Sequence, residues 1–406
     1  MQSDIQSQMS QSQMSQSQMS QSQMSQSQMS QSQMSQSQMS QSQMSQFQVP
    51  HTRNPKPGIM KAAVYKENGI ITLEHRPVPA LADPQDAIIR VTLTTICSSD
   101  IHIKHGAVPR AVPGTILGHE FVGIVEQTGE AVKKFKQGDR VAVNVETFCG
   151  ECYFCRRGYV NNCTHEHGGW ALGCRIDGGQ AEYVRVPFAD NGLTKIPDEV
   201  ADEAALFTGD ILSTGYWGAS LAEIKPADTV AVIGAGPTGL CTLMCARLYG
   251  PDMVIAIDTS DERLELAKEQ GLADVIINPL KQDVEQEVKK LTLGRGADAV
   301  LEVAGGRDTF RMAWKIARPN AVVCVVALYE EPQILPLPDM YGKNLVFKTG
   351  GVDASCCEEI MKLIKAGKLD TSCLITHRTK LEHIMEAYDV FENKKDHVIK
   401  YAIEVS

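Results

Sequence analysis

Four cysteines with the spacing of metal ligands are the strongest chemical signal in this sequence. Cys149, Cys152 and Cys155 follow one another at intervals of three, and Cys163 comes eight residues later. This spacing wraps four thiolates tetrahedrally around one zinc ion and leaves no coordination position open. It therefore predicts a structural zinc site. The alternative is that a Cys-x-x-Cys pair acts as a redox dithiol, but interspersed glycines indicate a loop and not the helix that such a pair opens.

A glycine-rich turn between an apolar strand and a helix is the second signal. An apolar segment at 229–233 runs into Gly234-Ala-Gly236-Pro-Thr-Gly239, and residues 240–249 have helical character. In this motif Gly234 permits a tight turn, Gly236 lets the backbone approach a pyrophosphate, and Gly239 lets the helix pack closely. The helix N-terminus adds amide hydrogens and a partial positive charge. We therefore expect a dinucleotide to bind here.

An acidic residue after the next strand bears on the choice of cofactor. Residues 253–257 form a second apolar segment, and Asp258 ends it, nineteen residues after Gly239. A carboxylate at this place accepts hydrogen bonds from a free ribose 2′-hydroxyl and repels a 2′-phosphate. The sequence therefore predicts NAD(H) in preference to NADP(H). Arg263 could weaken this preference, although its position suits the exposed face of a helix that begins after Ser260.

The elements around these motifs indicate an α/β protein. Apolar segments at 274–277, 298–303, 322–328 and 345–347 alternate with helical stretches. This alternation predicts a doubly wound parallel sheet, the Rossmann arrangement. Roughly 350 residues remain after the N-terminal tail, too many for one core, and they indicate two domains.

Composition excludes several classes of partner. The net charge is −10 with no basic block, so no nucleic acid is expected, and no apolar run is long enough for a membrane span. Twelve cysteines, several in metal spacing, suit a reducing cytoplasm better than a disulfide framework. Residues 1–58 are a Ser/Gln/Met repeat of period five and a linker, which predicts disorder. A metal-binding, aggregation-prone or assembly role of the tail is the alternative.

A third group of chemical side chains lies in a β-rich, glycine-punctuated segment. It consists of Cys97, Ser99, Asp100 and His102, followed by the Gly-His-Glu motif that contains His119 and Glu120. With the cysteine cluster and the glycine turn, these motifs resemble the zinc-dependent alcohol dehydrogenases of the medium-chain dehydrogenase/reductase family. The resemblance runs from Met60 to the C-terminus and is greatest to the secondary-alcohol and formaldehyde-dehydrogenase-like branch.

The resemblance implies a second, catalytic zinc. Cys97 and His119 match the first two ligands of that family, and Asp210 occupies the place of the third, where many relatives have a second cysteine. Glu120 matches a neighbouring carboxylate that binds zinc in some members. Three protein ligands leave one coordination position for an alcohol or carbonyl oxygen. A carboxylate ligand in place of a thiolate keeps the ligand charge at −1 but is a harder donor to the metal.

Further roles follow from the same resemblance. Ser99 and His102 match the family's proton relay, and Asp100 matches the residue that orients His119, as metal-bound imidazoles require. Each of the three has a plainer interpretation. Ser99 could be a turn residue, His102 a surface histidine, and Asp100 a helix cap.

The resemblance also implies a domain plan. Residues 60–213 would form a GroES-like β-rich catalytic domain, completed by 355–406, and residues 214–354 the NAD-binding domain. Thr214 falls where relatives contact the nicotinamide, with a structural turn as the alternative. Trp170 resembles a wall of the substrate pocket but could equally pack under a loop.

These observations predict a cytoplasmic NAD-dependent zinc alcohol dehydrogenase with two zinc ions per chain. It would interconvert a primary or secondary alcohol and its aldehyde or ketone. A formaldehyde-type or polyol-type dehydrogenase is the alternative within the family, and a non-catalytic NAD-binding protein is the alternative outside it. By resemblance, the chain forms a homodimer or homotetramer.

Overall fold

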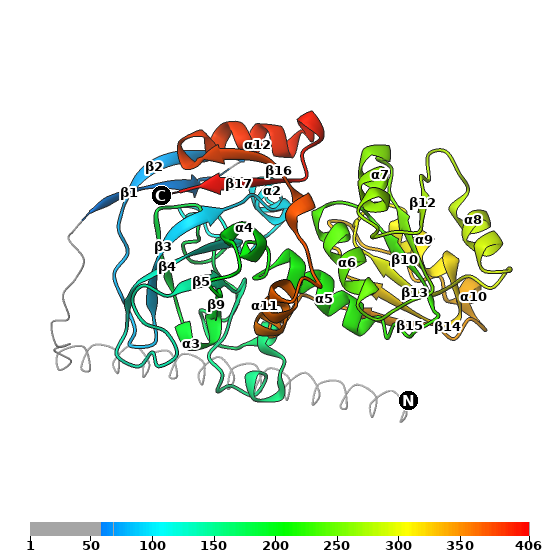
Figure 1. The fold of residues 1–406 in the computed structure, drawn as a ribbon, viewed down its shortest axis with the longest axis horizontal. Helices are drawn as coiled ribbons and strands as arrows, with labels where there is room; N and C mark the ends of the chain where they lie inside the picture. Colours follow the sequence, from blue (N-terminus) through cyan, green and yellow to red (C-terminus); the bar gives the residue numbers. More distant parts are fainter. Residues whose placement is uncertain (1–57, 68, 406) are drawn as a thin grey trace, which may run out of the picture. The chain divides into compact units, whose positions relative to one another are not determined.

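The structure, a computed structural model, describes residues 58–67 and 69–405. The prediction of a disordered repeat tail falls on residues 1–57, outside the described residues. Within the described part, two large sheets organise the chain, one of six strands and one of seven (Figure 1). The predicted α/β class, with a β-rich part and a doubly wound parallel sheet, is confirmed.

The six-stranded sheet is entirely parallel and runs in the order β12-β11-β10-β13-β14-β15. The chain leaves β10 on one side toward β11 and on the other toward β13, so the strand order reverses at β10. Open α/β sheets bind ligands at such a switch point. Its strands are β10 (Thr229–Ile233), β11 (Met253–Ile257), β12 (Val275–Ile277), β13 (Ala297–Glu302), β14 (Ala317–Val325) and β15 (Val346–Thr349).

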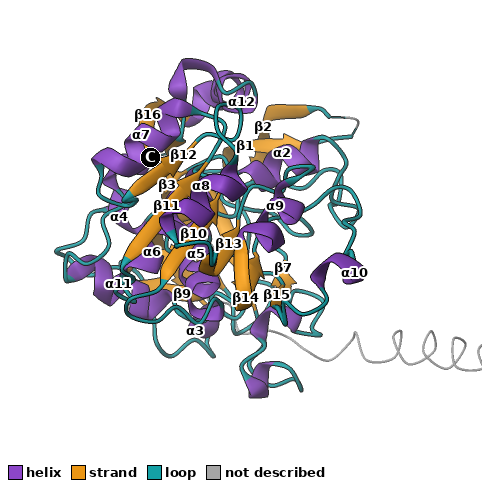
Figure 2. Cartoon of the chain, turned by 90° about the vertical axis from the view of Figure 1, so that its right-hand side faces the viewer, coloured by secondary structure: helices purple, strands orange, loops and turns teal. Residues whose placement is uncertain are grey.

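Helices cover both faces of this sheet (Figure 2). Successive side chains of a strand point to opposite faces, so apolar strands offer each face a surface for helices to pack on. Val230 and Val232 of β10 pack in a cluster with side chains of α6 and α7. Ala231 and Ile233 pack in another cluster with side chains of α8 and α9. The helices are α6 (Pro237–Arg247), α7 (Asp261–Glu269), α8 (Val284–Leu291), α9 (Thr309–Ile316) and the short α10 (Leu337–Met340).

The seven-stranded sheet runs in the order β16-β17-β3-β4-β5-β9, and β8 also pairs with β3. The C-terminal strand β17 pairs with β3, so the end of the chain joins the sheet formed by its first part. The domain boundaries at 213/214 and 354/355 stay predictions. The strands are β3 (Ala87–Thr94), β4 (Phe121–Thr128), β5 (Arg140–Val143), β8 (Tyr183–Val186), β9 (Leu193–Lys195), β16 (Ile375–Lys380) and β17 (Lys400–Glu404).

Smaller elements complete the described chain. Two two-stranded sheets pair β1 with β2 and β6 with β7. These strands are β1 (Ile59–Tyr65), β2 (Ile71–Pro77), β6 (Glu146–Thr147) and β7 (Gly169–Trp170). The remaining α-helices are α2 (Ser98–Lys104), α3 (Ala189–Gly192), α4 (Asp202–Ala205), α5 (Ile211–Leu221), α11 (Cys357–Lys365) and α12 (Ile384–Glu392).

One helix pair connects the two sheets. Helix α5 starts beside the seven-stranded sheet and packs against α6 of the parallel sheet. A Cβ atom added to Gly215 of α5 would lie 2.7 Å from the backbone of Cys241 and Thr242 in α6. Because a larger residue would push the helices apart, this glycine sets the distance between the start of α5 and the glycine turn before α6.

All twelve cysteines lie in the described part, and each has a free thiol. Among the described helices, none combines the length and the apolar character needed to cross a membrane.

Candidate active site

The four predicted structural cysteines come together in the loop between β6 and β7. Their sulfur atoms all lie within 4.8 Å of one another. Cys152 and Cys155 are 3.4 Å apart, and Cys149 and Cys163 are 3.6 Å apart. A tetrahedral zinc with Zn–S bonds of about 2.3 Å places its sulfurs about 3.8 Å apart. The cluster therefore fits one zinc ion held by four thiolates.

The loop itself supplies little other structure. It contains two short 3₁₀ turns, η1 (Cys155–Arg157) and η2 (Val160–Asn162), and Gly158 leaves the first with a φ of 81°. Backbone amides, first that of Cys155, lower the pKa of Cys152 to about 5. The Cys152 thiolate is thus available to a metal near neutral pH.

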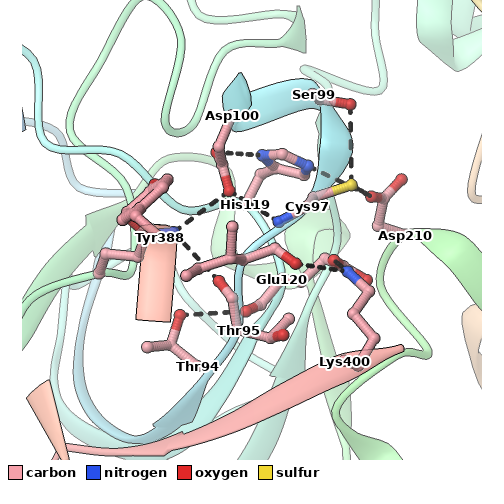
Figure 3. A network of polar contacts seen from close by, with 12 residues as sticks. Thr94, Thr95, Cys97, Ser99, Asp100, His119, Glu120, Asp210, Tyr388 and Lys400 are labelled. Atoms are coloured by element: carbon pink, nitrogen blue, oxygen red, sulfur yellow. Dashed lines mark hydrogen bonds and ion pairs between the residues drawn. The ribbon is translucent and has the colours of Figure 1, made fainter. Parts of the chain in front are cut away.

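The second predicted metal group also forms. Cys97 precedes α2, His119 and Glu120 precede β4, and Asp210 is the residue before α5. One ligand atom of each lies within 4.8 Å of the others (Figure 3). Oδ2 of Asp210 is 3.7 Å from the Cys97 sulfur and 3.3 Å from His119 Nε2. Around a tetrahedral zinc these separations would be about 3.5 Å and about 3.3 Å.

Burial decides the electrostatics of this group. Cys97, His119 and Glu120 are almost fully buried. Burial raises the pKa of the Cys97 thiol, the Lys400 ammonium lowers it in part, and the carboxylates of Glu120 and Asp210 raise it. Without a metal the Cys97 thiol therefore keeps its proton, and a zinc ion bound here would favour the thiolate, because a metal-binding cysteine must be deprotonated. The donor set of one sulfur, one imidazole and carboxylate oxygen suits zinc.

Asp100 contacts the metal group from behind. Its Oδ1 lies 3.4 Å from His119 Nδ1, while its Oδ2 accepts hydrogen bonds from the Cys97 amide at 2.9 Å and from Gln180 Nε2 at 3.2 Å. One oxygen of Asp100 therefore caps α2 and the other faces the imidazole, and the orienting role of Asp100 stays a prediction. The Tyr388 hydroxyl donates to Gln180 Oε1 at 2.7 Å and extends this buried chain.

Steric constraints explain why the first residue of the Gly-His-Glu motif is glycine. Gly118 has a φ of +94°, and a Cβ atom there would lie 2.6 Å from the backbone nitrogen and Cγ of Gln180. Only glycine permits both the left-handed backbone and this close approach. Gly118 thus lets Gln180 reach Asp100 behind His119.

Lys400 is a site residue that we did not predict. Its Nζ forms an ion pair with Glu120 Oε2 and donates to the carbonyl oxygen of Ile96 at 2.9 Å, with both charged side chains buried. Burial disfavours the ammonium charge, but the carboxylate of Glu120 raises the pKa of Lys400 above its usual value. A single lysine in the apolar stretch Val-Ile-Lys-Tyr-Ala-Ile was the available signal.

Replacing Lys400 with methionine is expected to lower the free energy of unfolding by about 3–5 kcal/mol, because it leaves the Glu120 carboxylate buried without its partner. The double variant Lys400→Met/Glu120→Gln should recover most of this loss. Urea unfolding of the single and the double variant measures the difference between their free energies of unfolding. The control is Lys395→Met, which breaks the exposed pair with Asp389 and should cost about 1 kcal/mol or less. Equal losses in the two single variants would contradict the assignment.

The predicted relay residues lie on α2 beside the metal group. Ser99 Oγ is 3.8 Å from the Cys97 sulfur. His102 is half-buried, and its Nδ1 lies 2.7 Å from Oε1 of Glu330. Thr214 lies one turn into α5, where its amide donates to the carbonyl oxygen of Asp210 at 2.7 Å. Among these contacts, the partner of His102 was not predicted.

Trp170 packs against the metal group. Its ring meets the His119 imidazole edge-on, with centroids 5.4 Å apart, and the Arg110 guanidinium lies 5.0 Å from its centroid. Glu146 is its partner across the β6–β7 pair. Burial raises the pKa of Glu146 to about 8, and its Oε2 has no hydrogen-bond partner among the described residues. Sequence reasoning missed Glu146 and Arg110, since neither stands in a motif.

The predicted nucleotide residues also meet. Gly234 has a φ of 106°, as a tight turn requires, and a Cβ atom on Gly239 would overlap the carbonyl oxygen of Gly234. Asp258 follows β11, and its Oδ2 accepts a hydrogen bond from the Ala235 amide at 2.7 Å. The carboxylate therefore sits directly at the glycine turn.

Arg263 is not simply on an exposed helix face, as its position suggested. It is half-buried, its Nη1 would lie 3.5 Å from a Cβ atom on Gly236, and it lines a cavity together with Asp258. Helix α7 begins after Ser260, as predicted, and this start turns Arg263 back toward the glycine turn.

Comparisons with known proteins agree with this geometry. The profile of the alcohol dehydrogenase GroES-like domain matches residues 83–198, and that of zinc-binding dehydrogenases matches residues 237–366. An alcohol dehydrogenase of Cupriavidus necator is 39% identical over 369 residues, which cover 85% of this chain and 99% of that protein. The chain belongs to the zinc-dependent alcohol dehydrogenases.

Two further relatives of this zinc-dependent alcohol dehydrogenase bear on its chemistry. The structure of zinc dependent alcohol dehydrogenase 2 from Streptococcus pneumonia matches with a TM-score of 0.80 and 39% identity, covering 86% of this chain and 99% of that one. An NADP-dependent isopropanol dehydrogenase of Thermoanaerobacter brockii is 33% identical over 337 residues, covering 80% of this chain and 94% of that protein. The activity of the chain is therefore zinc-dependent alcohol oxidoreduction with a nicotinamide cofactor.

Proposed function

We propose that this zinc-dependent alcohol dehydrogenase uses NAD(H) and holds two zinc ions per chain. One observation carries the proposed hydride transfer. Helix α5 begins directly after Asp210 and is fixed by Gly215 against α6, which begins at the glycine turn. A single helix thus ties the candidate metal group to the candidate nucleotide site, as hydride transfer between neighbouring substrate and cofactor requires.

The metal roles that we propose follow from the donor geometry. Cys97, His119 and Asp210 would hold the catalytic zinc, and the four-cysteine cluster would hold the structural one. Glu120 is engaged by Lys400 through Oε2 and would stay beside the catalytic zinc. When bound, the zinc would polarise an alcohol or carbonyl oxygen, and the nicotinamide would carry the hydride.

The side chains around this group would bind, orient and move the proton. Ser99 Oγ would accept the proton of a substrate hydroxyl and pass its own proton on, by way of the cofactor ribose, to Nε2 of His102. Asp100 fixes the orientation of His119. Trp170 would form an apolar wall that excludes water, and Thr214 would contact the nicotinamide.

The preference for NAD rests on the Asp258 carboxylate at the glycine turn. Replacing Asp258 with asparagine is expected to raise kcat/KM for NADP relative to NAD by about tenfold or more, since about 1.4 kcal/mol of repulsion suffices for this. Asparagine can still accept the hydrogen bond of the Ala235 amide. Steady-state kinetics with both cofactors measures the ratio.

The control for this experiment is Asp252→Asn, an exposed carboxylate just before β11, which should leave the ratio unchanged. Arg263 is the residue through which the prediction could fail, because an arginine at this place can accommodate a 2′-phosphate. A wild-type enzyme that already prefers NADP would contradict the proposed preference.

The proposed substrates are a primary or secondary alcohol and the corresponding aldehyde or ketone. A polyol-type substrate is favoured by one observation. Glu146, with its buried unpartnered oxygen, and Arg110 flank Trp170, and such groups could pair with additional hydroxyls. The proposed function is tested by NADH formation from primary alcohols, secondary alcohols and diols, with metal content per chain. A folded, metal-loaded protein that oxidises none of them would contradict it.

We also propose that the chain forms a homodimer through the edge of its parallel sheet and works in the cytoplasm. Strand β15 is an edge strand, and large apolar side chains are exposed at its first residue and in the segment before it. Exposed edges and apolar patches of this kind usually pair with another surface. These side chains are Ile334, Leu337, Tyr341 and Val346. In sedimentation experiments the wild type should be a dimer, and the Val346→Lys variant should dissociate into monomers at higher protein concentration than the wild type does. A monomeric wild type would contradict the proposal.

A further inference from the structure

We propose that Glu330 is a positioning residue for His102, holding it in the tautomer and orientation in which Nε2 accepts a proton. The inference rests on the proposed relay role of His102. Oε1 of Glu330 lies 2.7 Å from His102 Nδ1, although the two residues are 228 positions apart. The side chain of Glu330 is 57% exposed and that of His102 is 29% exposed, so the pair lies open to solvent at the Glu330 end.

The segment that carries Glu330 is held in place. It follows β14, and the amides of Val326 and Ala327 donate to the carbonyl oxygen of Glu302 at 2.8 and 3.2 Å. The Tyr329 hydroxyl lies 2.9 Å from Thr309 Oγ1 in α9. Glu330 comes directly after this anchored tyrosine and is thus presented to α2.

The chemistry of the pair selects one nitrogen of the imidazole. A carboxylate accepts the hydrogen of Nδ1–H, so a neutral His102 must leave the lone pair on Nε2. When Nε2 takes a proton from the hydroxyl that precedes it in the relay, that O–H bond breaks and its electron pair stays on the oxygen. A new N–H bond forms at Nε2, the Nδ1–H bond stays, and the carboxylate stabilises the resulting imidazolium. The proton then leaves to water on return to the neutral ring, with no other reactant needed.

Other charges near His102 are paired elsewhere. Lys104 at the end of the same helix and His105 just after it both contact Glu392 of α12, His105 through Nε2 at 2.6 Å. Glu330 is therefore the carboxylate that faces the ring of His102 in the described part of the chain. The pair also links α2, beside the seven-stranded sheet, to the segment that follows β14 of the parallel sheet. The tautomer of His102 therefore depends on this segment staying close to α2.

The test uses the full chain, metal-loaded and labelled with ¹⁵N-histidine. The variants are Glu330→Ala, Glu330→Gln and the matched control Glu331→Gln, an exposed neighbour. In wild type, the ¹⁵N shifts should report Nδ1–H on His102, whose signals are assigned by their loss in His102→Asn. Glu330→Ala should give a mixture of tautomers. Glu330→Gln keeps an acceptor oxygen and should restore the wild-type tautomer in part.

Kinetics provide the second measurement. Glu330→Ala should lower kcat for alcohol oxidation by about tenfold, as expected for a residue that acts through another, with the alcohol KM within about twofold. Glu330→Gln should fall between, and Glu331→Gln should match wild type. An unchanged tautomer in Glu330→Ala, or equal losses in the 330 and 331 variants, would overturn the proposal. A wild type inactive on every alcohol would refute the proposed function instead, while the tautomer measurement would still test the contact.

Discussion

Replacing Asp210 with alanine should remove one of two zinc ions per chain and lower alcohol oxidation by more than about 100-fold. Loss of a group that only orients a zinc ligand costs about 10–100-fold, and a direct ligand should cost more. Asp210 contributes Oδ2 at 3.7 Å from the Cys97 sulfur and 3.3 Å from His119 Nε2. Zinc per chain, by elemental analysis, and NADH formation on the same samples measure both effects.

Two further variants sharpen the experiment. Asp210→Cys keeps a ligand of charge −1 and restores the cysteine that many relatives have, so it should retain two zinc ions. Asp139→Asn is the control for loss of a largely buried carboxylate elsewhere, since Asp139 pairs with Lys195 at 2.8 Å away from the metal group. It should keep both zinc ions and activity. If Asp210→Ala kept full activity with unchanged zinc, the proposed catalytic ligand set would be wrong.

Local motifs explain how much of the fold was predictable. The glycine turn, the acid after the next strand and the alternating apolar segments depend on neighbours in sequence, and the structure places them as a doubly wound sheet with Asp258 at the turn. The four-cysteine loop is local in the same sense. Spacing alone carries such features, because a turn or a metal loop involves few residues.

Contacts between distant segments explain what was missed. Lys400 reaches Glu120 only because β17 pairs with β3 near the site, a pairing that no local pattern encodes. Glu330 meets His102 through the packing of an irregular segment. Glu146 is set opposite Trp170 by a pair of strands only two residues long. Tertiary packing brings these residues to the site, and the one signal in the sequence was the single lysine, Lys400, in an apolar stretch.

Loss of one thiolate from the four-cysteine loop is expected to have the largest effect on stability. Cys155→Ser should remove the closed-site zinc, because three thiolates and a weak hydroxyl cannot form the tetrahedral set. Structural zinc contributes about 10–16 kcal/mol to the folding of zinc-finger peptides. This loop has only two 3₁₀ turns of its own, so it should unfold locally. Limited proteolysis near residues 149–168, zinc content and thermal unfolding measure this, with Tm lower by about 5 °C or more.

The control is Cys324→Ala, a buried cysteine of β14 that belongs to neither metal group, which should retain both zinc ions and an intact loop. Activity separates the roles of the two sites. Cys155→Ser should keep the zinc of Cys97, His119 and Asp210, yet lose part of its activity, because the loop ends just before Trp170. Full activity with an unfolded loop would show that Trp170 needs no support from it. Loss of both zinc ions would contradict the view that the closed site is structural and independent of the open one.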